Sequence, residues 1–279
     1  MSKDRILLPD FIVIGAMKSG TTTLHRHLLD HPGIDMSRDK ETDFFVAEKN
    51  WPKGLRWYSG QFSHPGRKRG EVSPNYAKCR DFPGVPGRIV ALCPQVRLIY
   101  IVRDPVARAI SQFRHGFIQG RFGPEVLQGD CHEYAHIMDA SHYARQLDAY
   151  LTHFPQEAIV IVDFDDLITA PAKVMDRVAT HIGVAPHPAG AKRAQNDSAE
   201  LSRIPAGVLR LAQTPMGRAV GTRISRQSRD RIRAALALGR ARKMPDLPDA
   251  LLSRMRADLA GDVARFRRMT GMPFSHWSL

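Results

Sequence analysis

"FIVIGAMKSGTTTLHRHL", residues 11–28, places a glycine loop between an apolar run and a helix-like pattern. Gly15 and Gly20 have the separation of the two glycines in the phosphate-binding pattern G-x-x-x-x-G-K-[ST]. That pattern requires a lysine directly after the second glycine, but here Thr21 follows it and the lysine comes early, at Lys18. The stretch therefore predicts a phosphate-binding loop with an altered arrangement of its cation.

Two further apolar runs, residues 97–102 and 158–164, also precede helix-like patterns. Short β-branched runs without polar alternation are typical of strands that are covered on both faces, as in a parallel sheet. Pro105 and Pro171 mark helix starts, because proline is favoured in the first turn. The repeated units predict an α/β fold, specifically a P-loop-like three-layer fold with a central parallel sheet.

The chain is expected to form one domain over residues 1–279, with a core at about 8–190 and a basic helical C-terminal region at about 200–279. Residues 50–94 are rich in glycine, proline and aromatic side chains, which predicts irregular connections. Residues 203–243 contain a single acid, Asp230, among many arginines. An amphipathic helix is predicted at about residues 248–270.

The charge balance favours anionic partners. The 279 residues include 41 Lys+Arg against 28 Asp+Glu, a formal net charge of +13. Nucleotides, acidic polymers, anionic lipid surfaces and nucleic acids all fit such a chain. The first ten residues lack the apolar segment of a secretory signal, and no apolar run is long enough to span a bilayer. Three widely spaced cysteines argue against a disulfide framework, so we expect a cytoplasmic location.

The loop supplies a set of phosphate-binding groups. Backbone N–H groups at a loop-to-helix junction form an anion-binding nest, which the positive end of the helix reinforces. A second cation, Arg103, follows the strand at 97–102, where Walker enzymes place an acidic residue that helps to hold magnesium. The pattern predicts a nucleotide with two separated phosphate centres and no required metal. The candidate loop residues are Lys18, Ser19, Gly20, Thr21, Thr22 and Thr23.

Six blocks of sequence resemble one enzyme family. "GAMKSGTTTL" is similar to the 5′-phosphosulfate loop of sulfotransferases that use 3′-phosphoadenosine 5′-phosphosulfate (PAPS). "VRDPVARAISQFRH" resembles their 3′-phosphate motif, whose arginine and serine correspond to Arg103 and Ser111. "KETDFF", "GEVSPNYA", "SHYARQLDAYL" and "PAKVMDRVATHIGV" follow in the order of the branch that contains the heparan sulfate N- and 3-O-sulfotransferases and their bacterial relatives.

The resemblance implies transfer of a sulfuryl group from PAPS to a hydroxyl or amine, with 3′,5′-bisphosphoadenosine (PAP) as product and without a metal. It implies a carbohydrate, glycolipid or small-molecule acceptor. Glu41 matches the family's catalytic base, Lys18 would stabilise the departing phosphate, and His115 matches a histidine of the N-sulfotransferase branch, although a structural histidine is an equal reading. "GRARKMP" loosely resembles a late basic loop, which makes Arg242 and Lys243 further cofactor candidates.

This chain departs from the 3-O branch at two positions. Asp43 stands where that branch has a histidine, and Val72 stands where it has a lysine. Both differences bear on the acceptor, so the resemblance leaves the acceptor's identity open.

Two alternatives come from other patterns. His132, Glu133 and His136 nearly match the zinc-protease motif H-E-x-x-H-x-x-G-x-x-H, with His142 as a third ligand, but Asp139 replaces its glycine. The arginine-rich segment is most simply a solvated helical surface. It would alternatively bind nucleic acid or another anionic polymer, or contact an anionic membrane surface. We expect no nucleic acid partner, and the sequence does not indicate the oligomeric state.

Overall fold

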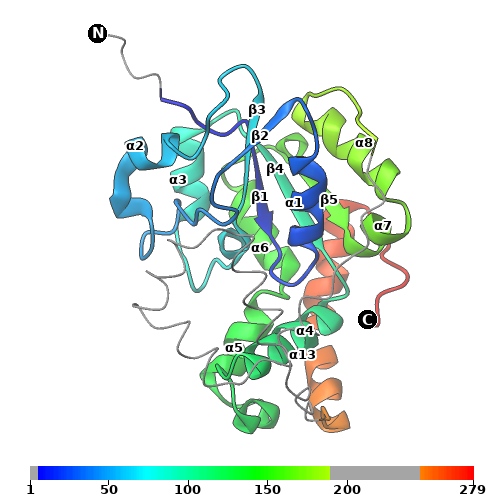
Figure 1. The fold of residues 1–279 in the computed structure, drawn as a ribbon. Helices are drawn as coiled ribbons and strands as arrows, with labels where there is room; N and C mark the ends of the chain where they lie inside the picture. The colour runs from blue at the N-terminus through cyan, green and yellow to red at the C-terminus, as the bar shows by residue number, and fades with distance from the viewer. Residues whose placement is uncertain (1–5, 189–245) are drawn as a thin grey trace, which may run out of the picture.

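The computed structural model describes residues 6–188 and 246–279, which form a central sheet with helices on both faces (Figure 1). All four strand pairings are parallel, and the strand order is β2-β3-β1-β4-β5. The predicted three-layer α/β fold with a parallel sheet is therefore confirmed. The strands are β1 (Phe11–Gly15), β2 (Ile34–Met36), β3 (Lys68–Val72), β4 (Arg97–Val102) and β5 (Ile159–Asp163).

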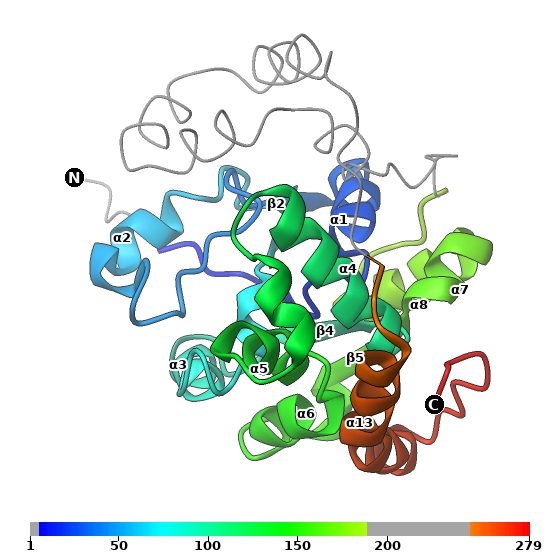
Figure 2. The same cartoon turned by 90° about the horizontal axis from the view of Figure 1, so that it is seen from below.

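Helices cover the sheet from both sides and carry the connections between its strands (Figures 1 and 2). They are α1 (Thr21–Leu29), α2 (Gly54–Ser59), α3 (Val85–Leu92), α4 (Pro105–Ile118), α5 (His132–Asp139), α6 (Tyr143–Leu151), α7 (Phe164–Thr169), α8 (Pro171–Ile182) and α13 (Asp249–Thr270). Short 3₁₀ helices occupy η1 (Trp51–Lys53), η2 (Pro74–Ala77), η3 (Pro124–Gln128) and η4 (Gln156–Ala158).

The two faces of the sheet have separate cores, because successive side chains of a strand point to opposite sides. In β1, Phe11 and Val13 pack with α1 and α8, while Ile12 and Ile14 pack with the cluster built from α3, α4, α6 and α13. Every residue of β1 is buried, which explains why its sequence reads as continuously apolar.

The strands β2 and β3 are a finding that the sequence did not predict. β3 reads "KRGEV" and lies within residues 50–94, where the glycine, proline and aromatic content led us to expect irregular connections. Gly70 pairs with Phe11 of β1, and a Cβ at Gly70 would lie 2.0 Å from the ring of Phe11. The strand fits between β2 and β1 because the glycine makes room for that ring, and because the buried Glu71 finds hydrogen-bond partners.

The last helix belongs to the main core. α13 packs against α4 and α6 (Figure 2), and Leu259, Val263 and Phe266 are buried in the same cluster as Ile12 of the sheet. Its bounds agree with the helix predicted at residues 248–270. The whole of the basic segment predicted at 203–243 lies outside the described residues. Within the described part of the chain, no helix combines the length and apolar composition needed to cross a membrane.

The topology places a switch point at the carboxyl ends of β1 and β4. β1 and β4 are neighbours, and the chain leaves β1 for α1 on one face but leaves β4 for α4 on the other face. Ligands of open α/β sheets bind outside the carboxyl ends of the strands at such a switch point. The loop after β1 and the residues after β4 therefore meet where this fold class binds its ligands.

Candidate active site

The loop after β1 has the backbone of an anion-binding turn. Lys18 and Gly20 both have positive φ angles, 68° and 92°, which is uncommon for a residue other than glycine. Gly20 caps the N-terminus of α1, and Ser19 before it is fully buried. Thr21, Thr22 and Thr23 form the first turn of α1, so their N–H groups lack partners within the helix. The loop thus presents backbone donors at the positive end of a helix.

Gly20 is required at its position for a reason beyond its φ angle. A Cβ placed there would lie 2.3 Å from Cδ2 of Phe164, the first residue of α7. The ring of Phe164 therefore lies directly against the loop backbone, and only a glycine allows this approach. This contact connects the segment that follows β1 with the segment that follows β5, at the carboxyl ends of the strands.

Arg103 also lies against the ring of Phe164. Its Cζ atom is 5.0 Å from the ring centroid of Phe164, in a cation–π arrangement. The hydroxyl of Tyr143 donates a 2.8 Å hydrogen bond to the carbonyl of Arg103 and fixes the backbone there. Asp104 then caps α4, because its Oδ1 accepts a 2.7 Å hydrogen bond from the N–H of Ala107. The predicted helix start at Pro105 is confirmed.

Ser111 and Arg108 follow on α4. Ser111 is half-buried, two turns beyond Arg103. Arg108 is fully buried. Among the described residues, its guanidinium donates hydrogen bonds to neutral acceptors, which are Ser141 Oγ, Gln112 Oε1, the carbonyl of Ile137 and the carbonyl of Met17 at 3.3 Å. Burial lowers the pKa of Arg108 to about 10, so the guanidinium stays charged at neutral pH. It adds a positive charge directly behind the loop.

His115 lies one further turn along α4, near the lysine of the loop. Burial, and then the positive charge of Lys18, lower the pKa of His115 to about 4. The imidazole is therefore neutral at neutral pH, and its Nε2 lies 3.0 Å from Nε2 of Gln119. Lys18 is near enough for its charge to act on the imidazole of His115, and a shared ligand for the two residues stays a prediction. A neutral imidazole does not act as a general acid, but its one N–H can donate a hydrogen bond.

The segment "KETDFF" carries the predicted base. Glu41 is 43% exposed, and its Oε1 lies 2.8 Å from Nζ of Lys40. The next residue, Thr42, is fully buried and points the other way. Glu41 therefore stands at the surface of a segment whose neighbours anchor it to the interior. Its role as a base remains a prediction.

Glu71 is the anchor beneath this segment, and the sequence reading did not single it out. Its carboxylate is fully buried at the end of β3 and accepts hydrogen bonds from the hydroxyl of Thr42, from Tyr58 at 2.7 Å and from Tyr76 at 3.0 Å. Ser73 donates a fourth, at 3.1 Å. Burial raises the pKa of Glu71 to about 7, although the four hydroxyl groups favour the charged form.

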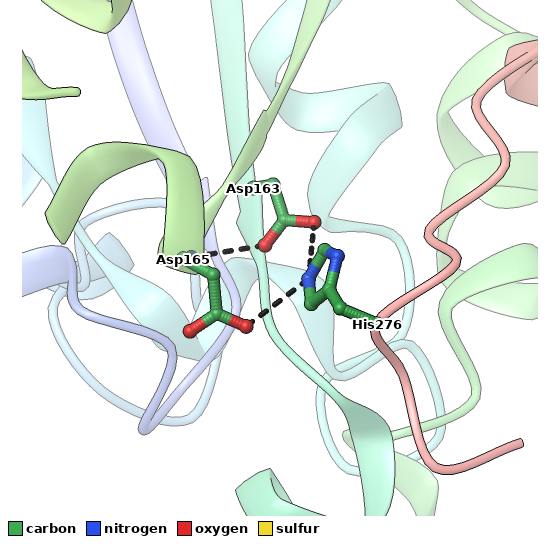
Figure 3. Close-up of side chains that lie close together, drawn as sticks. All are labelled: Asp163, Asp165 and His276. Carbon is green, nitrogen blue, oxygen red and sulfur yellow. Dashed lines mark hydrogen bonds and ion pairs between the residues drawn. The ribbon is translucent and has the colours of Figure 1, made fainter. Parts of the chain in front are cut away.

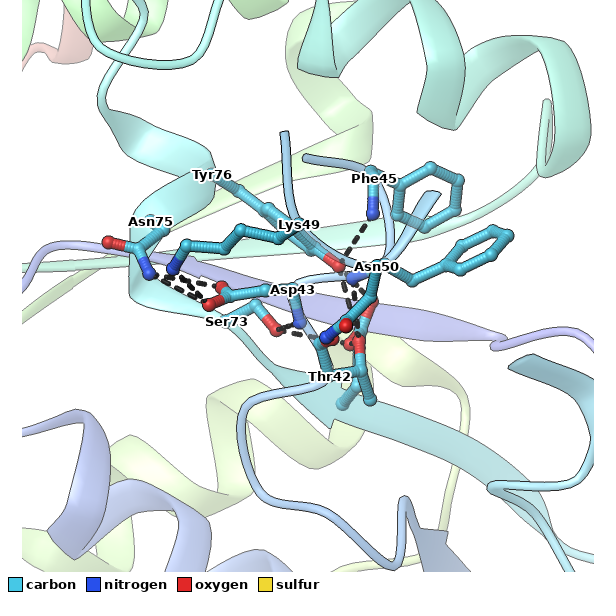
Figure 4. A network of polar contacts seen from close by, with 10 residues as sticks. Thr42, Asp43, Phe45, Lys49, Asn50, Ser73, Asn75 and Tyr76 are labelled. Carbon is cyan, nitrogen blue, oxygen red and sulfur yellow. Dashed lines mark hydrogen bonds and ion pairs between the residues drawn. The ribbon is translucent and has the colours of Figure 1, made fainter. Parts of the chain in front are cut away.

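Asp43 is held by a second polar network (Figure 4). Nζ of Lys49 lies 2.5 Å from its Oδ2, and Nδ2 of Asn75 donates to both of its carboxylate oxygens. Its backbone N–H donates to Ser73 Oγ at 3.1 Å. Asp43 has a φ of 44°, so the chain turns sharply here between Glu41 and the buried Phe44. The carboxylate is occupied by structural contacts.

The residues of the zinc-protease pattern do not converge. His132 and His136 lie on α5, but Nδ1 of His136 lies 2.7 Å from Oδ2 of Asp81. Within the described residues, a single group places three potential metal-binding atoms within 4.8 Å, and it consists of Asp163, Asp165 and His276 (Figure 3). In that group the imidazole is at ion-pair distance from both carboxylates, which accounts for the arrangement.

A family model described as "Sulfotransferase domain" matches residues 8–199 of the chain. The chain belongs to this sulfotransferase family. The resemblance seen in the six sequence blocks is thereby confirmed, and the loop after β1 and the residues after β4 lie within the matched range.

Mouse heparan sulfate glucosamine 3-O-sulfotransferase 5 is 31% identical to this chain over 194 residues. The match covers 64% of this chain and 54% of the mouse protein. Mouse bifunctional heparan sulfate N-deacetylase/N-sulfotransferase 3 is 30% identical over 203 residues, which cover 64% of this chain and 23% of that protein. The chain thus spans only part of the length of these curated relatives.

A solved structure supports the fold of this sulfotransferase domain. The crystal structure of a sulfotransferase from Alicyclobacillus acidocaldarius superposes with a TM-score of 0.68 at 20% identity, covering 98% of this chain and 100% of that chain. At this identity, the likeness shows the fold alone.

Two predicted cofactor residues lie outside the described part of the chain, and the sequence did not indicate two residues of the site. Arg242 and Lys243, the candidates from the late basic loop, lie outside the described residues of the sulfotransferase chain. Phe164 was missed because it joins two segments that are far apart in the sequence. Glu71 had a signal, since "GEVSPNYA" was one of the six blocks and a glutamate among small and aromatic residues is unusual in a buried strand.

Proposed function

We propose that the protein transfers a sulfuryl group from PAPS to a hydroxyl or amine of a carbohydrate acceptor. The observation that carries the proposal is the placement of two cationic segments against one ring. The loop with Lys18 follows β1, Arg103 follows β4, and Phe164 contacts both segments. A nucleotide with phosphates at both ends of its ribose fits two cationic centres at neighbouring strand ends.

The donor would bind across the carboxyl ends of β1, β4 and β5. The N–H groups of Gly20 and of the first turn of α1 would hold the 5′-phosphosulfate, as helix N-termini hold phosphates elsewhere. Arg103 and Ser111 would hold the 3′-phosphate from β4 and α4. Arg108 supplies positive potential behind the loop through its contact with Met17. This chain offers amide and cationic donors to the phosphates, so the binding needs no metal ion.

The transfer would proceed by in-line attack. Glu41 accepts the proton of the acceptor hydroxyl or amine, a new bond forms between that atom and sulfur, and the bond from sulfur to the 5′-phosphate oxygen breaks. Its electron pair stays on the phosphate oxygen of PAP, where Lys18 offsets the growing negative charge. The anchors of Thr42 and Asp43 fix the segment that carries Glu41.

The acceptor class rests on the relatives. The two curated relatives are named for sulfation of heparan sulfate, one at the glucosamine 3-hydroxyl and one at a nitrogen. A carbohydrate hydroxyl or amine is therefore the acceptor that we propose for this chain. The net charge of +13 suits an acceptor that carries negative charge.

Two measurements on the purified protein test the function. Calorimetry with PAP measures binding, and transfer of ³⁵S from labelled PAPS to a panel of amino sugars and polysaccharides measures activity. Lys18→Ala and Glu41→Gln should each reduce turnover by about 10²–10⁴-fold, and Glu41→Gln should still bind PAP. The exposed Lys173→Ala and Glu48→Gln serve as charge-matched controls. Folded protein without affinity for millimolar PAP would refute the proposal.

A further inference from the structure

Three consecutive backbone N–H groups shortly after Glu41 donate hydrogen bonds to side-chain hydroxyls (Figure 4). The pairs are Asp43 with Ser73 Oγ at 3.1 Å, Phe44 with Thr42 Oγ1 at 3.3 Å, and Phe45 with the hydroxyl of Tyr76 at 3.2 Å. Residues 41–45 belong to no helix or strand, so these hydroxyls supply the acceptors that a regular element would otherwise supply. The path of this segment therefore depends on how three side chains are oriented.

The same three hydroxyls all donate to one carboxylate, that of Glu71. Its Oε2 accepts from Thr42 and, at 3.1 Å, from Ser73. Its Oε1 accepts from Tyr76 at 3.0 Å and from Tyr58 at 2.7 Å. Each oxygen thus serves two hydroxyls, and the carboxylate is fully buried. One side chain therefore stands behind every hydroxyl that holds the segment.

The direction of these hydrogen bonds favours an ionised Glu71. A hydroxyl has one proton and two lone pairs, so it can donate to the carboxylate and still accept from a backbone N–H. An ionised carboxylate only accepts, and it therefore draws all four hydroxyl protons toward itself. A protonated Glu71 would donate its own proton to one of them and displace that hydroxyl's proton. The charge on Glu71 thus keeps the lone pairs turned toward the backbone.

Thr42 transmits this arrangement to the predicted base. Its hydroxyl donates to Glu71, and its carbonyl accepts a 2.6 Å hydrogen bond from Nδ2 of Asn50. Glu41 is the residue directly before it, and its side chain is 43% exposed. Because a rigid peptide plane joins the two residues, holding Thr42 also holds the backbone from which the Glu41 side chain extends.

We propose that Glu71 is a positioning residue for Glu41, whose ionised carboxylate orients the hydroxyls that hold residues 42–45 and so directs Glu41 toward the acceptor. The inference rests on the proposed function, in which Glu41 accepts the acceptor's proton. Glu71 is fully buried and acts through Thr42, so its effect falls on the transfer step. The groups assigned to PAP lie after β1 and β4, so PAP affinity should not depend on Glu71.

The titratable groups that face Glu71 stay neutral over the range of the test. They are Tyr58 of α2, Tyr76 of η2, Tyr150 of α6 and Cys93 after α3. Burial raises the pKa of each tyrosine well above its ordinary value and raises the pKa of Cys93 to about 12. Burial also raises the pKa of Glu71 to about 7, so raising the pH from 6 to 8 ionises this carboxyl.

Glu71→Gln gives the first test. Its amide nitrogen cannot accept, so whichever way the amide lies, two hydroxyls lose their acceptor, and either pair includes one that holds a backbone N–H. At pH 8, transfer of ³⁵S from saturating PAPS to the best acceptor of the sugar panel should fall by about 10–100-fold. The dissociation constant of PAP should stay within about twofold. Glu157→Gln, at an exposed position, should match the unchanged protein.

The pH profile adds a readout that a purely structural role would not move. Turnover of the unchanged protein should rise as the pH increases from 6 to 8, because the ionised carboxylate is the competent form. Glu71→Gln should lack this rise, since its side chain is neutral throughout.

A matched pair at Thr42 tests the link itself. Thr42→Val keeps the shape but removes the hydroxyl, and should lower turnover as Glu71→Gln does. Thr42→Ser keeps the hydroxyl and should restore turnover to within a few fold. Hydrogen exchange of a peptide covering residues 40–46, measured by mass spectrometry, needs no acceptor and should be about tenfold faster in Thr42→Val and Glu71→Gln. Thr152→Val, at an exposed threonine, should exchange normally in this peptide.

The outcomes separate the two proposals. Full turnover at pH 8 in Glu71→Gln, or equal turnover in Thr42→Val and Thr42→Ser, would overturn the inference and leave the function intact. A parallel loss of PAP affinity and turnover in Glu71→Gln would also overturn it, because Glu71 would then support the whole site. Folded, unchanged protein that does not bind PAP would refute the proposed function itself.

Discussion

The guanidinium of Arg103 lies over the ring of Phe164, with 5.0 Å between Cζ and the ring centroid. The same ring also lies against Gly20, so one aromatic side chain contacts the segments assigned to both phosphates. Phe164 is the first residue of α7 and directly follows β5. The spacing of the two cationic segments therefore depends on a residue at the end of a strand that carries neither cation.

Phe164→Leu should weaken PAP binding while leaving the fold intact. Leucine fills part of the volume but offers no aromatic face to Arg103, and a cation–π contact contributes about 0.5–2 kcal/mol. The dissociation constant for PAP should rise by about 3–10-fold, measured by calorimetry. Ile168→Ala, an exposed apolar position on the same helix, is the control and should bind PAP normally. Equal affinity in both variants would show that the ring does not support the arginine.

Gly20→Ala should cost more than the backbone conformation alone. A residue with a side chain at φ 92° is strained by about 1–2 kcal/mol, and here the new Cβ also collides with Phe164. Gly54 provides the matched control, because its φ is 76° and a Cβ there would meet nothing within 4 Å. Both variants should unfold at lower urea concentration, but only Gly20→Ala should lose PAP affinity by more than tenfold. Retained PAP binding in Gly20→Ala would contradict the assigned contact.

The parts of the fold that the sequence predicted are those whose residues are apolar on both sides. The runs at 11–15 and 97–102 are strands with those bounds, and the third, predicted at 158–164, is Ile159–Asp163. β3 was not predicted because Lys68, Arg69 and Glu71 are charged, and the burial of Glu71 depends on hydrogen-bond partners that only the folded chain supplies. Arg69 pairs with Asp10 at 2.9 Å, a residue 59 positions earlier.

The candidate site shows the same division. Lys18 and Arg103 were found because each follows an apolar strand in a local pattern. Phe164 and Arg108 were not, because their contacts join residues that are distant in sequence. Arg108, for example, reaches Met17 and Ile137, which are 91 and 29 positions away. Tertiary packing decides such contacts, and a single sequence carries no periodic signal for them.

Glu71→Gln should change how stability depends on pH. The pKa of Glu71 is about 7 in the folded protein against an ordinary value of 4.5, so the folded state binds this proton more tightly. The associated stabilisation is complete below pH 4.5 and is lost as the pH rises through 7. From pH 5 to pH 8 the unchanged protein should lose about 2 kcal/mol of unfolding free energy through this group.

The glutamine variant is neutral at every pH, so its urea-unfolding free energy should lack this part of the slope. Urea titrations at pH 5 and pH 8 measure the difference between the two proteins at each pH. Glu48→Gln, at an exposed position, should run parallel to the unchanged protein. Parallel behaviour of Glu71→Gln as well would mean that Glu71 is ionised in the folded state over the whole range.

Arg108→Lys tests whether the buried guanidinium supports the phosphate loop. An ammonium group donates from one point and cannot reach acceptors on Met17, Ser141 and Ile137 together, because the guanidinium spans them with a planar fork. Two buried acceptors would lose their partner, at about 1–3 kcal/mol each, so the unfolding free energy should fall by about 2–6 kcal/mol. PAP affinity should fall as well, because the carbonyl of Met17 loses its support beside Lys18.

Arg114→Lys, on an exposed turn of the same helix, is the control and should change neither the unfolding free energy nor the PAP affinity. A variant that is destabilised but binds PAP normally would limit Arg108 to a role in the core and remove it from the account of the site.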